Sequence, residues 1–288
     1  MKLSEVLKNG DFVITSEIGP PKGVAIEPML EEAEHLRGRV TAINVTDQQS
    51  SVMRLGSMAV SRLLKEQGIE PVFQVTCRDR NRIALQSDLL SAAALGIQNV
   101  LCLTGDYVSL GDHPDAKPVF DLDSVSLLYT AQQMMEGHDL SGAELIGKPD
   151  FCLGAVVSPA AEPLEPQLVK MERKVRAGAC FFQTQAVFDA EQFAQFVDQA
   201  KHFNVPILVG IIPLKSAGMA RFMNRNVAGV NVPEGLIDEM ADATDRLAKS
   251  IEICARLIRE MKDLCQGVHL MPVGWEKHVP SILDAADL

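Results

Sequence analysis

Polar side chains that are able to do chemistry follow a series of apolar segments along the chain. The apolar segment 12–18 carries a carboxylate at Glu17 and is followed by Gly-Pro-Pro. Later segments of the same kind end in Thr46-Asp47, Gln74, Thr104-Gly105-Asp106, Ser158 and Gln185. A carboxylate can donate or accept a proton, while amides and hydroxyls can hold the polar edge of a small molecule. If these side chains converge, they form a site for acid–base chemistry on a polar substrate.

Each of these residues also has an ordinary structural interpretation. Glu17 could simply pair with a cation at the rim of a barrel, and Asp106 could cap a turn or a helix. Gln185 could bond the backbone, and the adjacent Arg173 and Lys174 are usual on a solvated helix face. Only their gathering at one face of the fold would favour a site.

The elements that carry these residues alternate in a regular order. A strand-length segment of apolar or β-branched residues is followed by a segment with helical spacing, and the unit then repeats. We expect eight strands, in the ranges 12–18, 40–47, 70–77, 99–106, 151–158, 180–188, 205–213 and 267–274. Two separate helical stretches, near 234–249 and 251–265, are expected before the last strand.

Near-continuous apolar strands that alternate with helices indicate a parallel sheet covered on both faces. Eight such units predict an α/β fold, a TIM (β/α)8 barrel, formed by a single domain over residues 1–288. A doubly wound sheet is the main rival, but its G-x-G-x-x-G fingerprint after the first strand is absent. Because the carboxyl ends of all strands meet at one face of a TIM barrel, we expect the polar residues to line one mouth.

Composition and charge disfavour several function classes. The formal net charge of −11 opposes nucleic acid as a partner, and no apolar run approaches the roughly 20 residues that span a bilayer. The N-terminal segment lacks the apolar core of a signal peptide, so we expect a cytoplasmic protein. The six cysteines form no C-x-x-C pair, and no spacing typical of zinc ligands is present. We therefore expect reduced cysteines in the core and no metal.

Several motifs resemble, in order and spacing, the methylenetetrahydrofolate reductase family. They are SEIGPP at 16–21, VTD at 45–47, LTGD at 103–106, GDHPDAKPVFDLDSV at 111–125, ERKVRAGA at 172–179 and TQAVFD at 184–189. The family is a flavin-containing barrel that reduces 5,10-methylenetetrahydrofolate to 5-methyltetrahydrofolate, in one-carbon metabolism and methionine biosynthesis. The resemblance implies an oxidoreductase with a folate substrate and a flavin cofactor, with FAD favoured and FMN left open.

The resemblance also implies roles for three of the polar residues. The methylene group of the substrate bridges two nitrogens, and hydride from reduced flavin N5 can add only after the ring opens to an iminium cation. Ring opening requires protonation of the departing nitrogen, and Glu17 stands where the family keeps this general acid. Asp106 matches an aspartate near both flavin and folate, where a negative charge favours the cation. Gln185 matches the glutamine that holds the pterin ring.

Further residues fall at or near positions that contact the flavin in relatives. They are Thr46, Gln74, Thr104, Gly105, Asp106, Leu122, Ser158, Arg173 and Lys174. Arg173 and Lys174 are then expected to pair with ribityl or phosphate oxygens. Gln74 and Thr104 differ from the His and Arg that bacterial relatives can carry, which leaves the choice of flavin open.

The source of electrons is the main departure from the family pattern. Bacterial relatives that use NADH can place an aromatic residue near the position of Ala217, whereas the first aromatic here is Phe222. We therefore expect weakened direct use of NAD(P)H and supply of electrons to the flavin by a partner subunit, in a hetero-complex or oligomer. The chain also ends with the barrel, so no attached regulatory domain is expected.

Two other kinds of function stay open at this level. A different barrel enzyme, such as a flavin-dependent oxidoreductase like proline dehydrogenase or an aldolase, would share the fold. An aldolase needs a reactive lysine at a strand end, and none stands at those positions. The other possibility is a non-catalytic barrel subunit of an electron-transfer assembly, although Glu17, Asp106 and Gln185 together argue against it.

Overall fold

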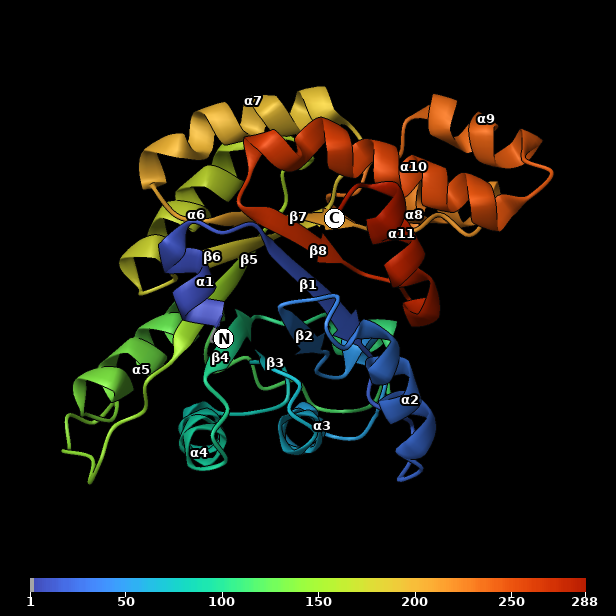
Figure 1. Cartoon of the computed structure of the whole chain (residues 1–288). Coiled ribbons are helices and arrows are strands. Elements are labelled where there is room, and N and C mark those ends of the chain that lie inside the picture. The colour runs from blue at the N-terminus through green and yellow to red at the C-terminus, as the bar shows by residue number, and fades with distance from the viewer. Residues whose placement is uncertain (1–2) are drawn as a thin grey trace.

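Parallel strands close on themselves at the centre of the molecule, and helices surround them (Figure 1). In residues 3–288, which the computed structural model describes, eight strands pair in sequence order and β8 closes onto β1. The strands are β1 Val13–Ile18, β2 Ala42–Val45, β3 Pro71–Thr76, β4 Asn99–Leu103, β5 Cys152–Val157, β6 Phe181–Ala186, β7 Ile207–Ile211 and β8 Gly267–Leu270. The predicted TIM barrel is confirmed, and each predicted strand range contains one of these strands.

Several helices begin at residues whose side chains accept hydrogen bonds from free backbone N–H groups of the first turn. The helices are α1 Leu3–Asn9, α2 Glu27–Leu36, α3 Ser57–Glu66, α4 Arg82–Ala94, α5 Ser124–Glu136, α6 Glu165–Arg176, α7 Ala190–Ala200, α8 Ala217–Asn226, α9 Glu234–Asp242, α10 Arg246–Met261 and α11 Val279–Ala285. Asn81, Asp123 and Asp189 accept hydrogen bonds from the first turns of α4, α5 and α7. Such caps stabilise a helix because its first N–H groups have no partner within it.

One predicted helix boundary is wrong. The sequence pattern places a break near residue 250, but α10 runs through this position and the break lies at 243–245. Asp245 starts α10 by accepting hydrogen bonds from Leu247 N and Ala248 N. Ser250 is buried on the same face as Ile253, so this polar residue interrupts the apolar pattern without ending the helix.

The interior of the barrel is layered, because successive residues of a strand face opposite sides of the sheet. The layer at the amino end of the strands is apolar and comprises Val13, Ala42, Val72, Leu101, Cys152, Phe181 and Leu208. Helix α1 packs against this layer through Leu3 and Val6 and covers the amino end of the barrel. The sequence analysis did not predict α1, which has only seven residues.

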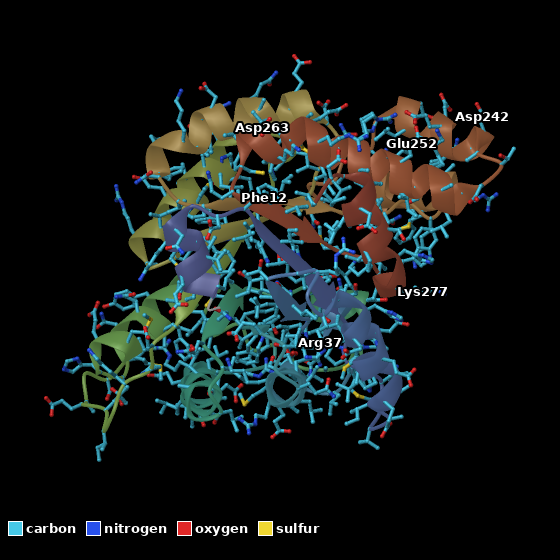
Figure 2. The ribbon with its side chains drawn as sticks, viewed as in Figure 1. Phe12, Arg37, Asp242, Glu252, Asp263 and Lys277 are labelled. Carbon is cyan, nitrogen blue, oxygen red and sulfur yellow. The ribbon has the colours of Figure 1, made fainter. Side chains whose placement is uncertain are left out.

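The outer surface of the molecule is charged. Figure 2 labels Arg37, Glu252 and Lys277, which lie on helices or the loops beside them, and all three are exposed. A second apolar core fills the space between the strands and the helices around them. In the described part of the chain, no helix combines the length and the apolar character needed to cross a bilayer.

All six cysteines are free, but one of them lies outside the core. Cys180 is exposed just before β6, and its Sγ lies 3.3 Å from the Sγ of Cys152. The prediction of a core position is therefore wrong for Cys180, because this residue precedes its strand instead of lying within it. For the buried Cys77, desolvation raises the pKa of the thiol to about 12.

Gly154 in β5 provides a test of the interior packing. A Cβ at this position would lie 2.3 Å from Phe181 Cζ and 2.9 Å from Leu101 Cδ1, and both neighbours are buried. Overpacking of this kind is expected to lower the free energy of unfolding of Gly154→Ala by about 1–3 kcal/mol in urea titrations. Phe181→Leu removes the ring, so the double variant should lose less stability than the two single losses combined. Additive losses would show that the contact does not exist.

Candidate active site

A cavity of about 420 Å³ opens at the carboxyl ends of the barrel strands. The predicted residues that line it are Glu17, Gln74, Thr104, Gly105, Asp106, Ser158, Lys174 and Gln185. They belong to five different strands or the loops that follow them, with Lys174 added from α6. The structure thus brings together residues that the sequence separates widely, at the face where TIM barrels carry their sites.

Glu17 lies at the base of this cavity. It points into the barrel from β1, in the same direction as Val13 and Thr15, and its side chain is only 10% exposed. The imidazole of His269 in β8 faces it, with His269 Nε2 lying 3.8 Å from Glu17 Oε2. This separation is longer than a hydrogen bond, so the carboxyl group keeps bonding capacity for a ligand.

Beneath Glu17 lies a layer of buried polar side chains, which we call the polar layer: Thr15, Asn44, Gln183 and His269. Gln183 is its centre, since its amide bonds Asn44 in both directions and donates to Thr15 Oγ1 at 3.1 Å. The sequence analysis missed this layer because it interpreted these strands as apolar runs. The signal was available, since Thr15 and Gln183 stand two residues before Glu17 and Gln185 and so face the same side.

The turn after β4 is shaped by a glycine. Gly105 has a φ of +95°, and a Cβ there would lie 3.1 Å from both Arg78 Cβ and Thr76 Cβ. Asp106 follows at the exposed rim, where its Oδ2 accepts a hydrogen bond from Ser50 N at 2.9 Å. The two predicted carboxylates therefore differ in setting, with Glu17 buried at the base and Asp106 exposed at the rim.

Asp47 and Thr46, at the end of β2, are both buried. The carboxylate of Asp47 pairs with Arg80 at 2.7 Å and accepts a hydrogen bond from Thr76 N at 2.9 Å. Asp47 is thus engaged in holding loops together. Thr46 Oγ1, by contrast, has no hydrogen-bond partner in the described residues, and it does not line the cavity.

The cationic wall of the cavity differs from the expected one. Gln167, Lys170 and Lys174 line it from one face of α6, at spacings of three and four residues. Arg173 is exposed and lies outside the cavity, because adjacent helix residues point about 100° apart. The sequence analysis paired Arg173 with Lys174 as neighbours and missed Lys170, which helical periodicity would have indicated.

A buried arginine is a second missed cation. Arg78, in the loop after β3, lines the cavity although only 2% of it is exposed. Its guanidinium pairs with Asp79 at 2.7 Å and donates to Gln48 Oε1 at 3.2 Å. The polar run that follows the third predicted strand is the signal that could have identified it.

Leu122 lies beside the main cavity. A neighbouring cavity of about 590 Å³ is lined by Leu122 together with Thr104 and Gly105, which also line the main cavity. Leu122 is buried, and it immediately precedes the residue that caps α5. The two cavities adjoin, so a ligand longer than one ring system could extend from one into the other.

Gln185 reaches the cavity at an irregularity in β6. The pairing between β6 and β7 shifts register between Gln183 and Ala186. In the shifted segment Gln185 Oε1 accepts a hydrogen bond from Ala186 N at 3.0 Å. Its amide N–H groups therefore remain free to face a ligand.

Fold and site together define the class of protein. It is a TIM barrel with a buried carboxyl group at the base of a polar cavity, amides above it and lysines on one wall, suited to acid–base chemistry on a small polar molecule. The family model for methylenetetrahydrofolate reductase matches residues 2–287. The chain therefore belongs to the methylenetetrahydrofolate reductase family.

Individual relatives agree with this assignment. Methylenetetrahydrofolate reductase 2 of Schizosaccharomyces pombe is 26% identical over 99% of this chain and 47% of its own length. The 5,10-methylenetetrahydrofolate reductase of Escherichia coli is 25% identical over 84% of this chain and 77% of its own. The chain spans about half the length of the eukaryotic relatives it matches.

A solved structure shares the fold over nearly its whole length. It is an uncharacterized protein from Clostridium thermocellum that binds two copies of 5-methyl-5,6,7,8-tetrahydrofolic acid. It has a TM-score of 0.70 and 18% identity, with 99% of this chain and 98% of that one covered. A 2,3-dimethylmalate lyase is more distant, with a TM-score of 0.56 and 12% identity over 99% of this chain and 87% of its own.

Among residues 3–288, no group of three or more His, Cys, Asp or Glu side chains is arranged to hold a metal ion. Glu17 is buried at the base of the cavity and Asp106 is exposed at its rim, while Asp47 is already paired with Arg80.

Lys174 should make stability depend on pH. Its Nζ is buried with Val156 O as an acceptor at 2.6 Å, and burial, followed by repulsion from Lys170, lowers the pKa of the amine from 10.5 to about 8. Between these values the unfolded chain binds more protons than the folded one, so the free energy of unfolding rises with pH across this window, by about 3 kcal/mol at most. Urea unfolding from pH 7 to 10.5 should show this rise and its loss in Lys174→Met. The exposed control Lys201→Met should keep it, and an identical profile in Lys174→Met would contradict the assignment.

Proposed function

We propose that this protein reduces 5,10-methylenetetrahydrofolate to 5-methyltetrahydrofolate with a flavin as the resident cofactor. The observation that carries the proposal is the position of Glu17, a carboxyl group 10% exposed at the base of the cavity. Membership of the family and the folate named for the similar Clostridium thermocellum protein support the substrate class.

Glu17 is proposed as the general acid. Its O–H bond breaks as a bond forms from its proton to the departing nitrogen of the five-membered ring, and the C–N bond opens to give the iminium cation. Glu17 is left as a carboxylate. Its side chain is only 10% exposed, which limits contact with proton donors from solvent and directs the transfer to a substrate bound in the cavity.

Two further residues are proposed to act on the folate. Asp106, at the rim, supplies a negative charge near the iminium cation, and its bond from Ser50 N fixes the orientation of the carboxylate. Gln185 is proposed to hold the pterin edge, because its carbonyl oxygen is taken by Ala186 N while its amide N–H groups are not.

The residues present fit a flavin. The adjoining cavities of about 420 and 590 Å³ offer an extended space, and Thr104 and Gly105 line both of them. Lys170 and Lys174, on one wall of the main cavity, supply charge for ribityl or phosphate oxygens. A reduced flavin bound here would supply the hydride. The neighbouring cavity beside Leu122 favours FAD over FMN, since the longer cofactor has a part to fill it.

A partner subunit is proposed as the electron donor. The described residues that line the main cavity include no Phe, Tyr or Trp, and Phe222 of α8 is 60% exposed. Nicotinamide stacking on α8 is therefore unsupported. Exposed apolar side chains stand on loops that follow the strands, among them Val24, Met53 and Tyr107, where a protein could dock.

The first experiment is an anaerobic visible spectrum of the purified protein during addition of 5-methyltetrahydrofolate. An oxidised flavin band that bleaches is expected, because the folate product returns its hydride to the cofactor. Protein purified without colour is first reconstituted with FAD and, separately, with FMN. Failure to bind either flavin would overturn the proposal. So would a bound flavin that stays oxidised with the folate, if dithionite can reduce it and its reduction potential is high enough for 5-methyltetrahydrofolate to reduce it.

Glu17→Gln separates the two halves of the reaction. The variant keeps the shape of the side chain but has no proton to give, so the folate-linked half-reaction should fall by about a hundredfold or more. Reduction of the flavin by dithionite should be unchanged, and so should the thermal unfolding temperature. Equal loss in both halves would assign Glu17 a structural role.

The electron donor is tested by steady-state kinetics with NADH and NADPH. The isolated chain should oxidise either nucleotide at least about tenfold more slowly than it reduces folate when an artificial donor replaces them. Turnover with NADH alone at the rate seen with the artificial donor would contradict the partner-subunit proposal.

A further inference from the structure

The polar layer fixes the hydrogen-bonding state of His269. Asn44 Nδ2 donates to Gln183 Oε1 at 2.7 Å, and Gln183 Nε2 donates back to Asn44 Oδ1 at 3.1 Å. This reciprocal pair uses one of the two protons on Gln183 Nε2. The other proton faces Thr15 Oγ1 at 3.1 Å and His269 Nδ1 at 3.3 Å.

Two donors therefore face one ring nitrogen. Thr15 Oγ1 lies 2.9 Å from His269 Nδ1 and 3.5 Å from Val268 O. Because it accepts from Gln183, its own proton is available to donate, and the ring nitrogen is by far the nearer of these two acceptors. An amide NH₂ group can never accept a hydrogen bond, so a proton on Nδ1 would point at Gln183 Nε2 unfavourably. Nδ1 is consequently the acceptor, and in the neutral ring the proton resides on Nε2.

Nε2 is the atom that faces Glu17. It lies 3.8 Å from Glu17 Oε2, and both side chains are buried and line the cavity. A charged pair is not needed here, since the neutral N–H already points its positive end toward the carboxyl group. Distances of this kind are often long without substrate and shorten when the charge develops.

We propose that His269 is a positioning residue for Glu17, held by Thr15 and Gln183 in the Nε2–H tautomer so that a fixed N–H meets the carboxylate. The proposal rests on the assignment of Glu17 as the acid. When the proton moves from Glu17 to the substrate nitrogen, Nε2–H donates a hydrogen bond to the carboxylate that remains and keeps its own proton. In the reverse reaction the same bond orients the carboxylate that accepts the proton.

The tautomer is measured without any catalysis. Protein labelled with ¹⁵N-histidine gives long-range ¹H–¹⁵N correlations that distinguish Nε2–H from Nδ1–H, and His269 is assigned among the six histidines by substitution. The expected pattern is the Nε2–H tautomer. A Nδ1–H pattern, or a mixture of the two, would overturn the proposal. Thr15→Val removes the hydroxyl donor and should reduce the Nε2–H fraction, whereas Thr15→Ser should keep it.

Two substitutions of His269 then separate its two nitrogens. In His269→Gln the side-chain amide nitrogen replaces Nε2 and can still donate to Glu17, whereas in His269→Asn it replaces Nδ1 and cannot reach. The folate-linked half-reaction should fall about tenfold to a hundredfold further in His269→Asn than in His269→Gln, the range for a hydrogen bond to a charged group. Dithionite reduction of the flavin and thermal unfolding should match in the two variants. Equal losses in both would assign His269 a packing role and overturn the proposal.

The results also separate this inference from the proposed function. If Glu17→Gln keeps the folate-linked reaction, the proposed acid is wrong whatever the tautomer of His269. If Glu17→Gln loses the reaction while His269→Asn and His269→Gln behave alike, the acid is correct and the positioning role is wrong.

Discussion

The burial of polar groups inside a closed barrel is the constraint on which this site depends. A buried amide or hydroxyl without a partner costs more than most packing contacts return, so the polar layer must be bonded throughout. Gln183 meets this requirement by bonding Asn44 twice and Thr15 once, and His269 completes the set. Below this layer the interior is apolar and α1 covers it, so water has no easy route from the amino end. The side chains beneath Glu17 are therefore held in place by hydrogen bonds, and its carboxyl group is accessible only from the cavity.

Local charge at the mouth opposes the charge of the whole chain. The protein carries a formal net charge of −11, yet Lys170 and Lys174 line one wall of the cavity. A cationic wall in an otherwise anionic molecule concentrates attraction on one spot, which favours an anionic group of a ligand there and disfavours a large polyanion such as nucleic acid elsewhere.

Features that depend on a local sequence pattern could be predicted, whereas features that depend on contacts between distant segments could not. The strands could be predicted because each is an apolar run followed by a helix, and the rule that strand ends meet at one face placed Glu17, Gln74 and Gln185 together. The strand-end rule does not reach Gln183 and His269. The two-residue spacing from Gln185 indicates which side Gln183 faces, but its bonds to Asn44 and Thr15 depend on partners from other strands. Arg173 shows the opposite error, because adjacency in sequence was preferred to the helical spacing that joins Lys170 to Lys174. Helix α1 was missed because its role comes from the barrel end that it covers.

Lys174 connects ligand binding to protonation. The buried amine pairs with a single carbonyl oxygen, and burial lowers its pKa to about 8, so part of the population is neutral in mildly alkaline solution. An anionic group bound beside it stabilises the charged form, and by linkage the same free energy favours uptake of a proton on binding. The energetic penalty of burying the amine in the free protein is therefore relieved when the ligand arrives. The buried charge of Lys174 therefore lowers the stability of the free protein and contributes favourably once an anionic ligand is bound. This is expected where a charged group is placed to bind a ligand and not to stabilise the fold.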